Sequence, residues 1–328
     1  MKKLKFKTEL PLSTFRDKIS HKDKLLLIGS CFSRDIGNKL RENKFHAFVN
    51  PFGILYDPLS ISRNLTLAIA NRAADAEGVI ENSGRFYHLD FHSDISGKSE
   101  EECLQHADKA VSICRSALEE LDFMFLTLGT SWIYRRNDSG KAIANCHKLP
   151  AKEFSKELLS VQDMELSLAG MLEKLLLTNP KVKVVFTISP VRHLKDGMHE
   201  NQLSKAALML AVDSVVKKFD HCMYFPSYEI MMDELRDYRF YKEDLLHPST
   251  LAIDYIWRYF SESFFSIASF QLLEEIQQIA SDVAHKPFHP ESDAHKKFLQ
   301  NLEGRILRFS KKHNLDYREE LEKLKSWS

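Results

Sequence analysis

Asp244 and His247, three residues apart, form the pair with the clearest chemistry in the sequence. On a tight turn, a carboxylate at this spacing can reach the imidazole Nδ1–H and fix the tautomer, which leaves Nε2 free to accept a proton from a nucleophile. A turn cap is the simpler interpretation, because Pro248 follows and a helix is predicted to start at Ser249 or Thr250. The pair becomes evidence for catalysis only if a nucleophile lies beside it.

A nucleophile for this pair is available near the N-terminus, where an apolar run over residues 25–28 predicts a short buried strand that ends at Gly29. An amphipathic helix is predicted over 35–45, so Ser30 and Cys31 fall between a strand end and a helix N-terminus. That position stabilises a thiolate or an oxyanion, and we expect a thiol there, beside the histidine, to have a lowered pKa. A glycine–serine turn followed by a buried structural cysteine would produce the same pattern without any function.

Polar residues also follow two further predicted strands directly. The strand over 123–128 ends in Gly129-Thr130-Ser131, and the strand over 182–189 is followed by Arg192 and His193. Arg192 could bind a carboxylate or a phosphate of a substrate through two parallel hydrogen bonds. A surface arginine and a histidine satisfied by backbone groups are the alternative interpretation of these two residues.

The predicted strands alternate with helical patterns, which indicates βαβ units and a parallel α/β sheet. The helical patterns cover residues 59–74, 100–118, 155–178, 201–219 and 250–265. Because parallel strands end at one edge of a sheet, we expect the polar groups after each strand to converge there, at the edge where open α/β sheets bind ligands.

The region after residue 265 differs from the rest of the chain. It is predicted to form two or three charged amphipathic helices without a strand, broken near Pro287 and Pro290. We therefore predict an α/β domain over 1–265 and a C-terminal helical extension over 266–328.

Composition limits the classes of function. The chain has 328 residues, 44% of them apolar and 28% charged, with 46 basic and 46 acidic residues, and this balance argues against a nucleic-acid binder. The five cysteines contain no CxxC spacing, so neither a structural zinc site nor a disulfide framework is expected. The sequence has no signal-peptide pattern and no apolar run of about 18 residues. We expect a cytoplasmic protein without metal or cofactor that does not bind membranes.

Five motifs resemble the GSCFA family, over about residues 20–262. The motif that matches the family name runs from Gly29 to Phe32, with Ser33 in place of the alanine. The other four motifs are Asn50-Pro51-Phe52-Gly53, Thr127-Leu128-Gly129-Thr130-Ser131-Trp132, Ser189-Pro190-Val191-Arg192-His193 and Asp244-Leu245-Leu246-His247-Pro248-Ser249.

The family in turn looks like a branch of the SGNH/GDSL hydrolases. That resemblance implies a three-layer α/β/α, flavodoxin-like fold and the hydrolysis of esters, often acetyl esters on carbohydrates. The Gly-Asp-Ser block of those enzymes matches the residues from Gly29 onward, which puts Cys31 at the nucleophile position. Ser30 is the alternative, because a one-residue shift of the turn would present its hydroxyl instead. The last block's aspartate and histidine match Asp244 and His247.

The resemblance also implies an oxyanion hole. The glycine of the second block is Gly53, whose N–H would act together with that of Cys31. The Gly-x-Asn of the third block corresponds to Gly129-Thr130-Ser131, so the asparagine is missing, and Ser131 or the nearby Asn50 could replace it.

These motifs predict an esterase that acts on an acyl ester of a carbohydrate or a small metabolite. An acyltransferase that uses the same site is one alternative. A non-catalytic ligand-binding protein is the other, and the altered first block and the missing asparagine favour it.

Overall fold

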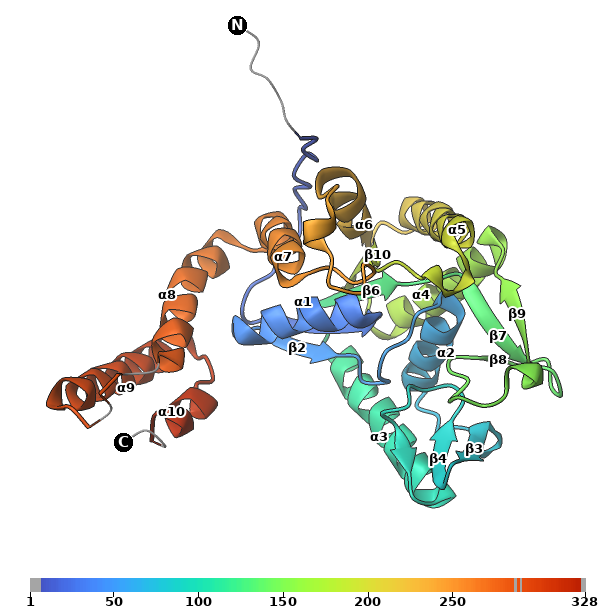
Figure 1. Ribbon diagram of the computed structural model, residues 1–328, viewed down its shortest axis with the longest axis horizontal. Coiled ribbons are helices and arrows are strands. Elements are labelled where there is room, and N and C mark those ends of the chain that lie inside the picture. The colour runs from blue at the N-terminus through green and yellow to red at the C-terminus, as the bar shows by residue number, and fades with distance from the viewer. Residues whose placement is uncertain (1–6, 286–287, 290, 326–328) are drawn as a thin grey trace, which may run out of the picture.

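The computed structural model describes residues 7–285, 288–289 and 291–325. Within this part of the chain, five parallel strands form the central sheet, in the order β11-β10-β6-β1-β2, with helices on both faces (Figure 1). The strands are β1 (Lys24–Gly29), β2 (His46–Val49), β6 (Phe123–Leu128), β10 (Lys183–Ile188) and β11 (Cys222–Tyr224). Counted among themselves they lie in the order 2-1-3-4-5, which is the flavodoxin-like order. The predicted α/β class is confirmed.

The continuous apolar character of the central strands follows from burial on both faces. Leu26 and Ile28 of β1 pack into the core beneath one helical layer, whereas Leu25 and Leu27 pack into the core beneath the other. The first layer contains α2 (Pro58–Ile69), α3 (Glu100–Glu119), α4 (Val161–Thr178) and α5 (Met198–Lys218), and the second contains α1 (Cys31–Glu42) and α7 (Thr250–Phe264).

Two small antiparallel sheets interrupt the βαβ pattern (Figure 1). The first contains β3 (Val79–Asn82), β4 (Arg85–His88) and β5 (Ser96–Gly97), and the second contains β7 (Trp132–Arg136), β8 (Ala142–Ile143) and β9 (Phe154–Leu158). The second sheet corrects the predicted helix over 155–178, because residues 154–158 pair with β7. The helix begins only at Val161, after Ser160, whose hydroxyl accepts the Asp163 N–H and caps it.

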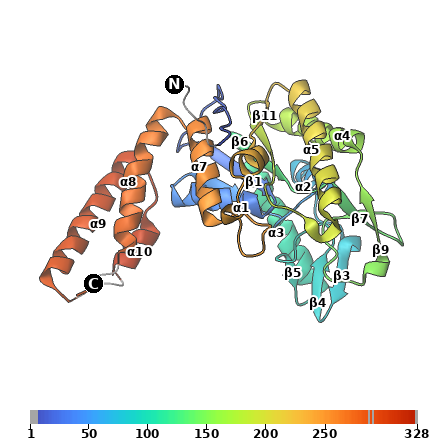
Figure 2. The same ribbon diagram turned by 45° about the horizontal axis from the view of Figure 1, so that its top comes forward.

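The C-terminal region is helical, as predicted, through residue 325. It contains α8 (Ile267–Ala284), α9 (Asp293–His313) and α10 (Arg318–Lys325), which enclose a core of their own. Figures 1 and 2 show these helices projecting to one side of the sheet, beyond α7. The predicted breaks at Pro287 and Pro290 lie outside the described residues. Among the helices that the structure describes, none combines the length and the apolar character needed to cross a bilayer.

The cover over the second face depends on aromatic packing by α7. Phe260 is 2% exposed and lies 5.2 Å from the Phe125 ring of β6 and 5.6 Å from Phe225, measured between ring centroids. We expect Phe260→Ala to lower the free energy of unfolding by about 3–5 kcal/mol, because it leaves a cavity in a close-packed core. Urea denaturation of the full chain would measure this loss. Leu251→Ala on the solvent side of α7 is the matched control, and equal small losses in both variants would contradict the prediction.

Candidate active site

The end of β1 lies against the end of β6, and Gly29 makes this approach possible. The φ of Gly29 is 144°, and a Cβ there would lie 2.1 Å from the Thr127 carbonyl oxygen. The Gly29 N–H donates to Asn50 Oδ1 at 2.9 Å, which ties the strand end to the loop after β2. Since β1 and β6 flank the point where the strand order reverses, the residues that follow them stand where such sheets bind ligands.

Cys31 is the first residue of α1, which therefore starts earlier than the sequence predicted. Its side chain is 9% exposed. Burial raises the pKa of the Cys31 thiol, and the nearby Asp35 carboxylate raises it further. The N–H groups of Cys31 and Phe32 lower this pKa, but their effect is smaller. The expected lowering of the thiol pKa is thus wrong: desolvation outweighs the helix terminus, and the resting group is a thiol that needs a base.

Ser30 lies directly beside Cys31 but faces a different environment. Its hydroxyl is fully buried and donates to Ser189 Oγ at 3.0 Å. Cys31 lines the pocket at the sheet edge, whereas Ser30 does not. Of the two nucleophiles that the sequence offered, the structure presents the thiol to a ligand.

Asp244 and His247 make the contact that their spacing predicts. Asp244 Oδ2 lies 2.6 Å from His247 Nδ1, and Asp244 Oδ1 accepts the backbone N–H groups of Leu246 and His247 at 2.9 Å each. Leu245 adopts a left-handed φ of 59° between them. The two backbone hydrogen bonds, followed by the imidazole, lower the pKa of Asp244 to about 2. The carboxylate is therefore ionised at neutral pH and orients the ring.

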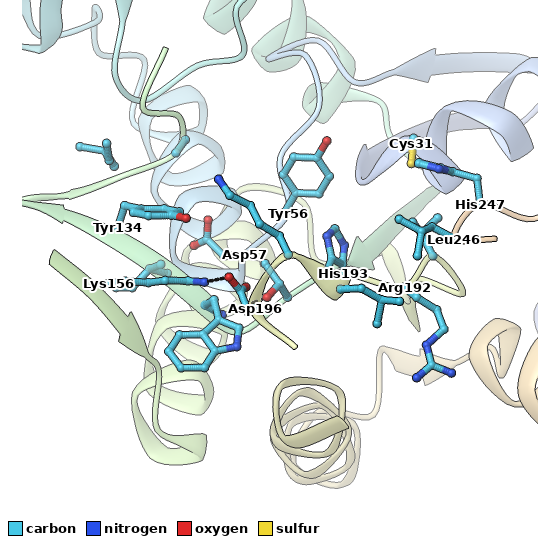
Figure 3. A pocket seen from close by; sticks show the side chains of 18 residues that line it. Cys31, Tyr56, Asp57, Tyr134, Lys156, Arg192, His193, Asp196, Leu246 and His247 are labelled. Carbon is cyan, nitrogen blue, oxygen red and sulfur yellow. Dashed lines mark hydrogen bonds and ion pairs between the residues drawn. The ribbon is translucent and has the colours of Figure 1, made fainter. Parts of the chain in front are cut away.

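A pocket of about 410 Å³ is lined by both Cys31 and His247. Figure 3 shows Cys31 and His247 at one end of it, and Tyr134 and Lys156 of the small β7–β9 sheet at the other. Trp132 also lines the far end, where Lys156 lies 4.7 Å from the centre of its ring and forms an ion pair with Asp196.

The sequence did not single out Tyr134, Lys156 or Asp196 as site residues. The first two stand on antiparallel strands that carry no strong pattern, and residue 156 fell within a predicted helix. Tyr56 was also missed. It lines the pocket next to His193, with their ring centroids 5.5 Å apart.

The groups expected to form the oxyanion hole are engaged elsewhere, which corrects that part of the prediction. The Gly53 N–H donates to the Asn50 carbonyl oxygen at 2.8 Å, and the Gly129 N–H donates to the Tyr56 carbonyl oxygen at 2.7 Å. The N–H and hydroxyl of Ser131 both bond to Ser204, so Ser131 does not replace the missing asparagine. None of these three glycine or serine residues lines the pocket.

Asn50 has a structural role and one unused donor. Its Oδ1 accepts the Gly29 N–H, while its Nδ2 is buried and has no hydrogen-bond partner among the described residues. The backbone amides at the start of α1 remain as donors beside the thiol, because the first N–H groups of a helix have no acceptor within the helix.

Arg192 and His193 are neighbours in the sequence but differ in their contacts. The Arg192 guanidinium points away from Cys31 in Figure 3, and its Nη1 contacts Met232 Sδ at 3.8 Å. Arg192 nevertheless lines the pocket, so the substrate contact predicted for it stays a prediction. His193 also lines the pocket, and burial lowers its pKa to about 4, so the ring is neutral at pH 7. Within the part of the chain that the structure describes, its Nε2 forms no hydrogen bond.

No group of three His, Cys, Asp or Glu side chains in the described part of the chain is arranged to hold a metal ion. The chemistry available at this edge is that of a thiol, an Asp–His pair and a set of amide donors.

The architecture defines a flavodoxin-like α/β protein with a cysteine and an Asp–His pair at its topological switch point. Residues 24–260 match the GSCFA family, and residues 276–326 match the C-terminal domain of GSCFA domain proteins. Since the first match spans more than half of the sequence, the chain belongs to the GSCFA family. No similar protein was found among curated ones.

The relative effects of the backbone N–H groups and of the imidazole on the pKa of Asp244 can be tested. Because the two backbone N–H groups lower its pKa more than the imidazole does, the carboxyl of His247→Ala should still titrate below about 3.9, the ordinary aspartate value. Carbon-detected NMR titration of the side-chain carboxyl would measure this in the wild type and the variant. A return to the ordinary value in His247→Ala would mean that the imidazole alone is responsible.

Proposed function

We propose that this protein is an acyl-ester hydrolase with Cys31 as nucleophile and His247 as general base. The observation that carries the proposal is that the Cys31 thiol and the His247 imidazole, oriented by Asp244, line one pocket at the carboxyl edge of the sheet. The resemblance of its sequence motifs to the blocks of SGNH/GDSL hydrolases supports the same chemistry.

The first half of the reaction forms a thioester. His247 Nε2 takes the proton of the Cys31 thiol as Sγ attacks the acyl carbonyl carbon, and the carbonyl π electrons move onto oxygen. The tetrahedral intermediate then expels the alkoxide, which takes the proton from His247 Nε2 and leaves as the alcohol. Asp244 accepts the Nδ1–H throughout and stabilises the imidazolium that forms.

The second half returns the enzyme to its starting state. Water gives a proton to His247 Nε2 and attacks the thioester carbon, the carbon–sulfur bond breaks, and the proton returns to Cys31 Sγ as the carboxylic acid leaves. The developing oxyanion would be stabilised by the N–H groups of Cys31 and Phe32 and by the positive end of the α1 dipole. In a water-poor pocket such donors contribute more than they would in solution.

The far end of the pocket suits a polar, ring-containing alcohol as the leaving group. Trp132 and Tyr134 provide aromatic surface, and the Lys156–Asp196 pair provides charged hydrogen-bonding groups. A volume of about 410 Å³ suits a small molecule. This combination supports an acyl ester of a carbohydrate or a similarly polar metabolite.

A non-catalytic ligand-binding protein is the second candidate, and one observation favours it. The Gly53 amide, which the resemblance assigns to the oxyanion hole, donates to a backbone carbonyl instead. A pocket of this kind could bind an ester without stabilising its tetrahedral intermediate.

Brief exposure to p-nitrophenyl acetate distinguishes the two candidates. We expect intact-protein mass spectrometry to find one acetyl group on the wild type and on Ser30→Ala, and none on Cys31→Ala. His247→Ala should release p-nitrophenol at least about 100-fold more slowly than the wild type, because it lacks the general base.

Circular dichroism of each variant serves as the control for folding. An adduct that persists in Cys31→Ala, or an unchanged rate in His247→Ala, would overturn the mechanism. The absence of an adduct and of p-nitrophenol release in every protein would favour the binding protein.

A further inference from the structure

Lys205 of α5 is buried beneath the same sheet edge, at 1% exposure. Its ammonium donates to the carbonyl oxygen of Gly129 at 2.7 Å and to that of Ser189 at 2.8 Å, which are the first residues after β6 and β10. The face of the Tyr228 ring lies 5.6 Å away. Lys205 therefore holds two neighbouring strand ends together with a charged group.

This ammonium has no anionic partner in the described part of the chain. Both of its recorded acceptors are neutral carbonyls, and no carboxylate there pairs with it or raises its pKa. Removing a charge from water without a counter-charge is costly, so an uncompensated buried cation calls for an explanation beyond packing.

The Cys31 thiol, which follows the neighbouring strand end, can become negative. Two hydrogen bonds to Ser189 lie between the groups: Lys205 donates to the Ser189 carbonyl oxygen, and the hydroxyl of Ser30, the residue before Cys31, donates to Ser189 Oγ. Negative charge on Cys31 favours the charged form of Lys205, in addition to the two carbonyl oxygens and the Tyr228 ring that the ammonium contacts. The Lys205 ammonium and a Cys31 thiolate would therefore attract each other.

We propose that the Lys205 ammonium is the fixed positive charge that stabilises the Cys31 thiolate when it forms. Lys205 is a positioning residue, because it acts through Cys31 and does not line the pocket. The inference deepens the hydrolase proposed above and rests on Cys31 being its nucleophile.

The stabilisation should depend on pH in a specific way. Burial, with a smaller contribution from Arg192, lowers the pKa of Lys205 to about 7. The ammonium is therefore charged below pH 7 and neutral well above it, while the pKa of the Cys31 thiol is raised. The Lys205 ammonium should therefore stabilise the Cys31 thiolate at acid and neutral pH, and this stabilisation should be lost at alkaline pH.

Other groups also face this pair, and the experiment must hold them constant. The groups that face Lys205 are Arg192, His193, Tyr228 and Cys31. The groups that face Cys31 are Arg34, Asp35, Tyr56 and, at the same end of the pocket, His247. Of these, we remove His247 in all proteins that are compared, because its imidazole is the proposed proton acceptor.

The rate at which iodoacetamide alkylates Cys31 measures the fraction of thiolate, and the measurement needs no ester substrate. The rate at the Cys31 peptide would be followed by mass spectrometry from about pH 5.5 to about pH 9.5 in His247→Ala and in His247→Ala with Lys205→Met. We expect the first protein to react on the order of tenfold faster below pH 7, which corresponds to one pKa unit. The rates should converge above about pH 9, where Lys205 is neutral.

Lys217→Met in the same background is the matched control, since Lys217 lies on the solvent side of α5. It should leave the profile unchanged. Equal rates with and without Lys205 at every pH would overturn the inference.

If Lys205→Met does not fold, the pH dependence of alkylation in the His247→Ala protein is itself the test. Its rate should rise less than tenfold per pH unit between about pH 7 and pH 9, as the ammonium is lost, and a straight tenfold rise would overturn the inference. A Lys205-dependent thiolate in a protein that never forms an acyl adduct would refute the hydrolase and leave this charge pair standing.

Discussion

The contact between the backbone of Gly29 and the Thr127 carbonyl determines the rest of the site. It permits β1 and β6 to end side by side, where any side chain at position 29 would separate them. The chain then turns directly into α1 with Cys31 at its first position. The strand order reverses at the same place, so the groups after β6 and β10 and the Asp244–His247 turn gather around that helix end. A displacement at this point would move every reactive group together.

The groups inside the site are mostly neutral, and the charged groups near Cys31 lie around it. The Cys31 thiol is buried and its pKa is raised, the pKa of His193 is lowered so that its ring is neutral, and the Lys205 ammonium beneath the strand ends is held by carbonyl oxygens. Asp244 carries a negative charge at the exposed rim, beside His247. A reaction that develops negative charge inside the pocket would therefore move that charge toward a cation already in place, with little reorganisation of the protein.

The sequence predicted the parts of this structure that repeat a simple rule. Apolar runs located β1, β6 and β10, and the edge rule brought Cys31 to the Asp244–His247 pair. The small β7–β9 sheet was missed because strand 154–158 is half exposed and continues into a helical pattern. The pKa of Cys31 was misjudged because burial is a property of the assembled core. Lys205 gave no signal, since a lysine in an amphipathic helix is ordinarily solvated, and only tertiary packing buries it.

The C-terminal helices attach to the far end of the helix that carries Cys31. Lys44, just beyond α1, pairs with Glu320 and lies 4.6 Å from the centre of the Tyr317 ring, while the adjacent Asn43 contacts Gln277 of α8. A hydrogen-bonded helix of 12 residues is a stiff rod of about 18 Å. The Cys31 thiol and the helical extension are thus fixed to opposite ends of one rod, so a mechanical load on the extension would be transmitted along its axis to the sulfur atom.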